Sequence, residues 1–142
     1  MSGNSWVLTI DGGARGNPGP AGAGIVLDDA RHRRIAAEAR PLGRATNNVA
    51  EYEGLLRGLE LAQEHGARRL TVRSDSELLV RQMTGEYKVK AEHLKPLADR
   101  ARTLVAQFDL VQFEAIPREQ NREADRLANE AMDAVERGTA PA

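Results

Sequence analysis

The sequence predicts an α/β fold with a mixed β-sheet, and three observations support this. Up to residue 40, apolar and polar residues alternate, which is typical of β-strands separated by short turns. From Asn48 onward, apolar residues recur every three or four positions, which indicates an amphipathic helix. Strand-like and helical segments then follow one another to the end of the chain, as in parallel β-α-β units.

The first 40 residues predict three antiparallel strands. Residues 5–11 alternate between two faces, and Asp11 is the last of them. The segment 12–19 is rich in Gly, Asn and Pro and predicts a turn. Residues 21–28 and 33–40 predict two further strands. Their short connections favour an antiparallel meander.

The rest of the chain predicts four helices and two strands. The first helix is expected over 48–65, with a capping box between Asn48 and Glu51 and an end at Gly66. The later elements are expected at 69–75 (strand), 76–84 (helix, ended by Gly85), 91–106 (helix), 109–116 (strand) and from Asn121 onward (helix).

Length and composition describe an ordinary globular chain. Its 142 residues contain no cysteine, which excludes disulfides, a thiol nucleophile and a cysteine-ligated zinc site. No run of 18 apolar residues occurs, and residues 1–5 do not resemble a secretory leader, so we expect no membrane contact and a cytoplasmic location. We expect a single domain over residues 1–137 and a flexible C-terminal tail over 138–142.

The charge of the chain is small but unevenly distributed. The formal net charge of −1 argues at first sight against a nucleic-acid partner, because proteins that bind phosphates are usually basic. All three lysines, Lys88, Lys90 and Lys95, nevertheless lie within eight residues of one another. They form either a small cationic patch or the solvated start of a helix.

Four acidic residues lie at the ends of predicted elements. Asp11 and Asp75 end strands, Glu51 lies in the first turn of the first helix, and Asp125 lies near the start of the last helix. Sites in open α/β sheets form at strand ends, and clustered carboxylates are stable when cations such as Mg²⁺ or Mn²⁺ lie among them. Each acid also has a purely structural interpretation, and spacing alone does not show that the four converge.

Four segments of the chain resemble, in order, the motifs of type 1 ribonucleases H. They are DGGARGNPGPAG at 11–22, TNNVAEY at 46–52, SDS at 74–76 and PREQNREADRLA at 117–128. The resemblance runs from about Trp6 to about Ala134, nearly the whole chain. A single DGG or SDS would be weak, whereas the ordered set is specific.

The resemblance implies a ribonuclease H-like, five-stranded mixed sheet in the order 3-2-1-4-5, with strand 2 antiparallel and about four flanking helices. It implies an endonuclease that hydrolyses the RNA strand of RNA–DNA hybrids with little sequence specificity, leaving a 3′-hydroxyl and a 5′-phosphate. By position, the catalytic and metal-binding acids are Asp11, Glu51, Asp75 and Asp125, with two Mg²⁺ or Mn²⁺ ions during catalysis.

The resemblance also implies which residues bind the substrate. Asn17, Asn47 and Asn48 match residues that meet the minor groove, where 2′-hydroxyls are displayed. Arg44 and Thr46 match a pocket for a phosphate of the DNA strand. We expect an RNA–DNA hybrid as the partner, a monomeric enzyme and no requirement for a protein partner.

The chain departs from many bacterial members of the family in two places. The loop before the last helix lacks their catalytic His, and Arg118 in this loop is a candidate to reach the leaving phosphate. Residues 85–90 replace a Trp-rich basic protrusion, for which Lys88 and Lys90 are a candidate substitute, and we expect no N-terminal hybrid-binding domain. This short form resembles the archaeal-like branch, some of whose members also cut double-stranded RNA, so that substrate stays open.

Two other functions compete with this one. A different nuclease of the same fold would share only scattered acids, so the DGG and TNN segments speak against it. A non-catalytic hybrid-binding module would not need all four acids, which are intact here.

Overall fold

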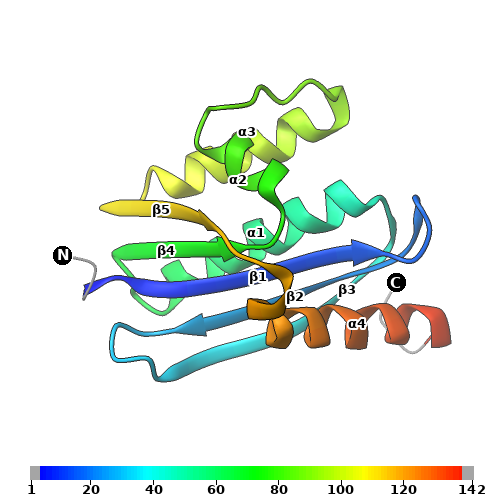
Figure 1. Ribbon diagram of the computed structural model, residues 1–142, viewed down its shortest axis with the longest axis horizontal. Helices are drawn as coiled ribbons and strands as arrows, with labels where there is room; N and C mark the ends of the chain where they lie inside the picture. The colour runs from blue at the N-terminus through cyan, green and yellow to red at the C-terminus, as the bar shows by residue number, and fades with distance from the viewer. Residues whose placement is uncertain (1–3, 139–142) are drawn as a thin grey trace.

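A single five-stranded sheet, in the order β3-β2-β1-β4-β5, organises the computed structural model, which describes residues 4–138 (Figure 1). β2 is antiparallel to both β1 and β3, whereas β4 is parallel to β1 and to β5. The predicted mixed sheet, its strand order and its antiparallel second strand are therefore confirmed. The strands are β1 (Trp6–Ala14), β2 (Gly19–Asp28), β3 (Arg34–Ala45), β4 (Arg69–Ser74) and β5 (Leu110–Ala115).

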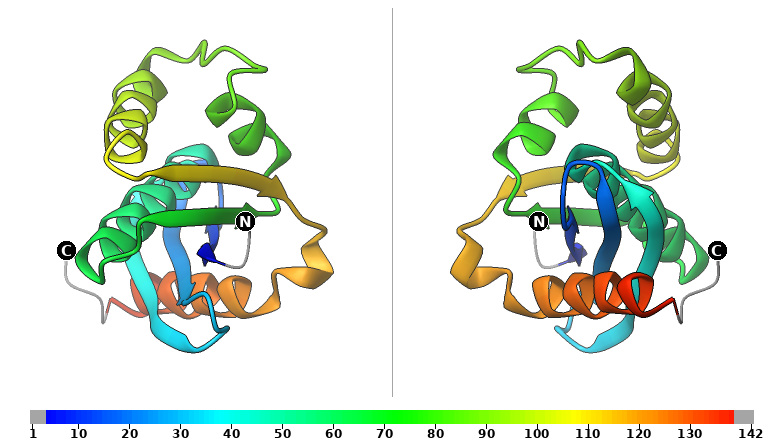
Figure 2. Two further views of the ribbon diagram at one scale, coloured as in Figure 1. Left: turned by 90° about the vertical axis from the view of Figure 1, so that its left-hand side faces the viewer. Right: turned by 90° about the vertical axis from the view of Figure 1, so that its right-hand side faces the viewer.

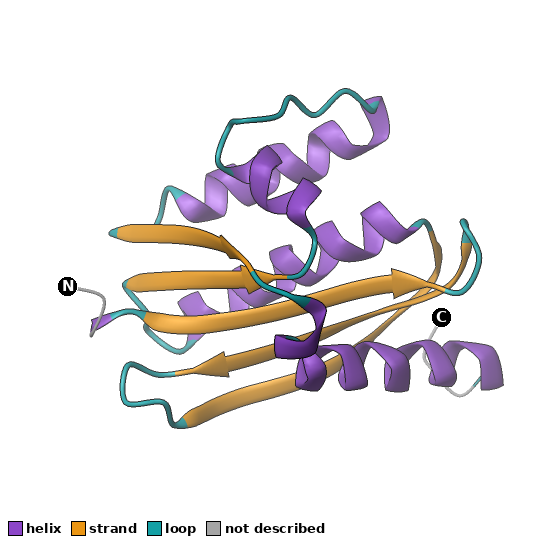
Figure 3. Cartoon of the chain, in the orientation of Figure 1, coloured by secondary structure: helices purple, strands orange, loops and turns teal. Residues whose placement is uncertain are grey.

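Helices cover both faces of this sheet. α1 and α3 pack together on one face, and α4 lies across β1, β2 and β3 on the other (Figures 2 and 3). The main core lies between α1, α3 and the sheet, and includes Leu8, Ile25 and Leu59. None of the described helices is long and apolar enough to cross a bilayer. The helices are α1 (Asn47–Glu64), α2 (Glu77–Met83), α3 (Lys95–Val105) and α4 (Arg122–Arg137), with short 3₁₀ turns at Glu92–Leu94 and Arg118–Gln120.

The start of α1 differs from the prediction. Thr46 caps the helix, and its hydroxyl accepts a hydrogen bond from the Val49 amide at 3.2 Å. The predicted capping box between Asn48 and Glu51 is therefore wrong, because both residues already lie inside the helix. Glu51 consequently lies in the second turn of α1 rather than the first, where it gains little from the helix dipole.

The end of β1 also differs from the prediction. Asp11 does not end the strand, because the next three residues continue to pair with β2 up to the Ala14–Ala21 pair. The predicted tail lies almost wholly outside the described residues. Gly138, the first of it, ends α4 in the left-handed conformation that glycine favours.

Two glycines let helices approach the sheet at backbone distance. A Cβ on Gly12 would lie 2.6 Å from the Glu51 amide nitrogen, so α1 packs directly on β1 at this point. A Cβ on Gly24 would lie 1.9 Å from the Ala124 carbonyl oxygen, so α4 packs equally closely on β2. Both contacts adjoin predicted site residues, and any larger side chain would push the helices away from the sheet.

Candidate active site

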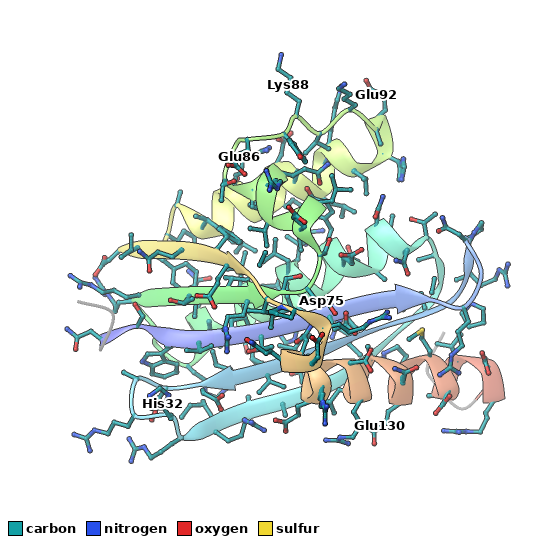
Figure 4. The ribbon with its side chains drawn as sticks, viewed as in Figure 1. His32, Asp75, Glu86, Lys88, Glu92 and Glu130 are labelled. Carbon is teal, nitrogen blue, oxygen red and sulfur yellow. The ribbon has the colours of Figure 1, made fainter. Side chains whose placement is uncertain are left out.

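The strand register brings Asp11 and Asp75 together. The parallel pairing of β1 with β4 ends at the Ile10–Ser74 pair, and the two aspartates are the next residues along the chain. Neighbouring parallel strands end at the same edge of a sheet, so both carboxylates reach one crevice. Asp75 lies near the centre of the molecule, where the chain leaves β4 (Figure 4).

Glu51 joins this crevice from α1. The close approach of α1 to Gly12 places the second turn of the helix beside Asp11. The Ser76 hydroxyl donates a hydrogen bond to the Glu51 carboxylate. The same hydroxyl accepts from the Leu79 amide at 3.2 Å and thereby caps α2. One side chain thus ties Glu51 to the residue that follows Asp75.

Asp125 reaches the same crevice from α4. The Asn121 side-chain amide donates to the Ile10 carbonyl at 3.1 Å, which fixes the start of α4 against β1. Asp125 lies close enough to Asp11 to raise the pKa of that carboxyl group. All four predicted catalytic acids therefore share one pocket of about 460 Å³. Its lining comprises Asp11, Gly12, Gly13, Ala14, Arg15, Asn47, Glu51, Asp75, Ser76, Arg118, Asp125, Asn129 and Met132.

The pocket disfavours negative charge on two of its acids. Burial raises the pKa of Asp11 to about 8, and the charge of Asp75 and the hydrogen bond with Asp125 act in the same direction. Burial also raises the pKa of Glu51 to about 7, although the hydrogen bond from Ser76 opposes this rise. Without a cation, the site therefore holds protons near neutral pH.

The donor set fits a hard divalent cation by its chemistry. Carboxylate oxygens are the ligands that Mg²⁺ and Mn²⁺ prefer, and four carboxylates face one pocket here. Among the described residues, no group of three or more His, Asp or Glu side chains is arranged to hold an ion as it stands. Asp11 nevertheless lies close enough to the other three acids for each of them to raise its pKa.

The predicted substrate-binding residues fall into two regions. Asn47 lines the acidic pocket, and its side-chain carbonyl oxygen accepts from the Ala14 amide at 3.0 Å. The Asn17 side-chain carbonyl oxygen accepts from the Asn47 amide at 3.0 Å. Both asparagines therefore use their acceptor atom within the protein, and among residues 4–138 their NH₂ groups have no hydrogen-bond partner. Thr46 uses its oxygen as a helix cap, and Arg44 is exposed on β3, opposite Pro20.

The predicted cationic residues do not surround the acids as a group. Arg118 lines the acidic pocket, whereas Lys88, Lys90 and Asn48 line a separate groove of about 480 Å³ beside α2. Lys88 extends into solvent from the loop above α2, far from Asp75 (Figure 4). Arg15 lines the acidic pocket too, but it bonds to Asp133 at 2.5 Å and Glu136 at 3.2 Å. Its charge is thus largely compensated by α4.

The sequence patterns pointed to no role in the pocket for three residues. Ser76 follows Asp75 directly within the SDS segment at 74–76, where only Asp75 was assigned a role. Asn129 lies one helical turn after Asp125, and its side chain donates to the Asp125 carbonyl at 2.9 Å. Met132 lies a further turn along the same face of α4. The four-residue spacing from Asp125 was the available signal for Asn129.

Comparison with known proteins places these residues in a family. A family model described as reverse transcriptase-like matches residues 9–131. The bifunctional protein Rv2228c of Mycobacterium tuberculosis is 50% identical over 135 residues, which are 94% of this chain and 37% of the relative. The ribonuclease HI of Halobacterium salinarum is 42% identical over 124 residues, which are 87% of this chain and 62% of the relative. The chain thus spans less than two thirds of the length of these relatives.

Solved structures agree with the sequence relatives. The N-terminal RNase H domain of Rv2228c superposes with a TM-score of 0.92 at 48% identity, covering 96% of this chain and 99% of that domain. LC11-RNase H1 in complex with an RNA/DNA hybrid has a TM-score of 0.88 at 43% identity, covering 93% of this chain and 99% of that chain. The chain therefore belongs to the reverse transcriptase-like family and, within it, is a homologue of the type 1 ribonucleases H.

Proposed function

We propose that this protein hydrolyses the RNA strand of RNA–DNA hybrids as an endonuclease, with little sequence specificity. The observation that carries the proposal is the convergence of Asp11, Glu51, Asp75 and Asp125 in one open pocket. Homology to ribonuclease HI, and to LC11-RNase H1 with its bound hybrid, supports the choice of substrate. We further propose a monomer that needs no protein partner, because one chain supplies all four acids.

The four acids are proposed to hold Mg²⁺ or Mn²⁺, two ions during catalysis. Bound there, such ions would supply an activated water and stabilisation of the leaving oxygen, giving a 3′-hydroxyl and a 5′-phosphate. Asp11 is the central ligand in this arrangement because it interacts with each of the other three acids. Ser76 holds the Glu51 carboxylate in place through its hydroxyl.

Recognition of the hybrid is proposed to depend on donor groups around the pocket. The free NH₂ groups of Asn17 and Asn47 suit acceptors in a minor groove, including the oxygen of a 2′-hydroxyl. Asn48 faces the groove beside α2, together with Lys88 and Lys90. Asn48 is proposed to meet the minor groove as the other two asparagines do, whereas Lys88 and Lys90 in this groove, and Arg44 with Thr46, are the proposed contacts to phosphates of the DNA strand.

A cleavage panel tests this function. Purified protein is incubated with labelled hybrid, double-stranded RNA, single-stranded RNA and double-stranded DNA, in Mg²⁺, Mn²⁺ or EDTA. We expect cleavage of the hybrid with either cation, none in EDTA and none after Asp75→Asn. Metal-dependent cleavage of double-stranded RNA as well would add a second substrate. Absence of hybrid cleavage would contradict the proposal, and cation-independent hybrid binding without cleavage would favour a binding module instead.

A further inference from the structure

The side chain of Asn121 is buried at the junction between β1 and α4. It is only 1% exposed, and its NH₂ group donates to the Ile10 carbonyl at 3.1 Å. Its main-chain carbonyl accepts from the Asp125 amide at 3.0 Å. One residue is thus bonded to the residue before Asp11 and to Asp125 itself.

Asn121 occupies the N-cap position of α4 but does not cap the helix with its side chain. Asparagine at this position usually accepts a bond from an amide of the first turn, and no such bond is formed here. The Oδ1 atom is buried and lacks a hydrogen-bond partner within the described part of the chain. A buried acceptor without a partner is unfavourable. The residue is therefore better explained by the bond that its NH₂ group makes.

This bond closes a ring that includes two acids of the site. From Asn121 it passes to Ile10 and along β1 to Asp11. Asp125 lines the same pocket as Asp11, and the Asp125 amide returns to Asn121. Aspartate, serine or threonine would cap α4 equally well, but none of them offers this amide donor.

We infer that Asn121 is a positioning residue that fixes the Asp125 carboxylate beside Asp11 for binding of a divalent cation. The inference rests on the proposed function for the identity of the ligand. Residues that orient metal ligands without touching the ion contribute about 10- to 100-fold to metal affinity. Loss of the amide donor should therefore weaken cation binding while the fold is retained.

Two variants separate positioning from capping. Asn121→Ser and Asn121→Asp both place an oxygen that favours helix capping at this position, and both lose the amide that reaches Ile10. Mn²⁺ binding to the substrate-free protein is measured by calorimetry, with circular dichroism to confirm folding. We expect the Kd for Mn²⁺ to rise about tenfold or more in both variants. Asn121→Asp is the stricter test. Its added carboxylate would by itself lower the Kd for Mn²⁺, so a higher Kd in this variant has to come from loss of the amide donor.

The control is Leu61→Ala, which removes core packing in α1 away from the pocket. It should lower the melting temperature and leave the Kd for Mn²⁺ unchanged. A wild-type Kd in both Asn121 variants would overturn the inference and leave Asn121 with a role in packing at the start of α4 only. If the wild-type protein binds Mn²⁺ but does not cut the hybrid, the proposed function fails, whereas the comparison of Kd values still decides the role of Asn121.

Discussion

Asp11 occupies an environment that opposes its negative charge. Its pKa of about 8 exceeds the ordinary value of 3.8, chiefly because it is buried and because Asp75 is close. Between these two values the folded protein binds more protons than the unfolded chain. The free energy of unfolding therefore falls as pH rises from about 4 to about 8 in the absence of a cation. Glu51 acts in the same direction, because its pKa is raised to about 7.

The first prediction follows from this repulsion. In EDTA at pH 8, Asp11→Asn should be more stable than the wild type by about 1–3 kcal/mol, which is less than the full pKa shift implies because the pocket is open to solvent. Near pH 4 the difference should be small, since the wild-type carboxyl is then protonated in the folded protein. Urea unfolding at both pH values measures it. Parallel pH dependence in the two proteins would contradict the prediction, and Glu53→Gln, outside the pocket, is the matched control.

Arg118 is the cationic side chain of the acidic pocket that other residues of the protein hold least firmly. It is exposed, lines the pocket, and forms no salt bridge within residues 4–138. Arg118→Ala should lower kcat about tenfold with little change in melting temperature, as expected for one charge-assisted bond to a phosphate. Arg122→Ala, four residues later and outside the pocket, should keep the wild-type kcat. An unchanged kcat in Arg118→Ala would remove this role.

At the level of elements, the sequence predicted every strand and helix and missed some of their ends. Alternation and helical spacing depend on which residues face the core, so β4 and α4 could be located from the sequence. The ends of β1 and α1 could not, because they depend on contacts between distant segments. β1 continues to Ala14 because β2 pairs with it, and Thr46 rather than Asn48 caps α1, although both residue types are common at helix N-caps.

The segment between α2 and α3 carries the third prediction. Lys88 and Lys90 are exposed beside the groove next to α2, whereas Lys95 is bound to Glu92 at 2.7 Å. Replacing both Lys88 and Lys90 by alanine should raise KM for the hybrid about threefold to tenfold at low salt and leave kcat unchanged. The slope of log KM against log salt should fall by up to about two, because each lysine that binds a phosphate contributes about one to it. Lys95→Ala is the control, and a salt dependence that matches the wild type would exclude these two lysines as phosphate ligands.

At the scale of the whole molecule, the fold was more predictable than the convergence of the site. The four acids lie up to 114 positions apart, and their spacing alone left each with a structural interpretation. Three contacts bring them together: the Ile10–Ser74 register, the approach of α1 at Gly12 and the Asn121 bond to Ile10. These are tertiary contacts, which no local pattern encodes, so only the family motifs could anticipate them.

The net charge of −1 is a poor guide to how this chain interacts with nucleic acid, because the charges are unevenly distributed. Four carboxyl groups are concentrated in one pocket, so above about pH 8, where Asp11 and Glu51 are ionised as well, this pocket should repel a phosphate backbone in the absence of a cation. The repulsion depends on salt, because ions screen charges exposed to solvent over about 10 Å at 0.1 M. Binding of a hybrid in EDTA should therefore be limited by the acids rather than by the total charge.

Removing one of these charges should strengthen binding without any catalysis. In EDTA at low salt and about pH 9, where Asp11 and Glu51 are ionised in both proteins, Asp75→Asn should bind the hybrid about two- to fivefold more tightly than the wild type, the effect of one charge several ångströms from a phosphate in a partly screened site. The difference should vanish at high salt. Fluorescence anisotropy with a labelled hybrid measures both Kd values, and Glu53→Gln, which removes a charge outside the pocket, should bind like the wild type. Equal Kd values for Asp75→Asn and the wild type at low salt would mean that the hybrid does not approach these acids, and that its main contacts lie elsewhere.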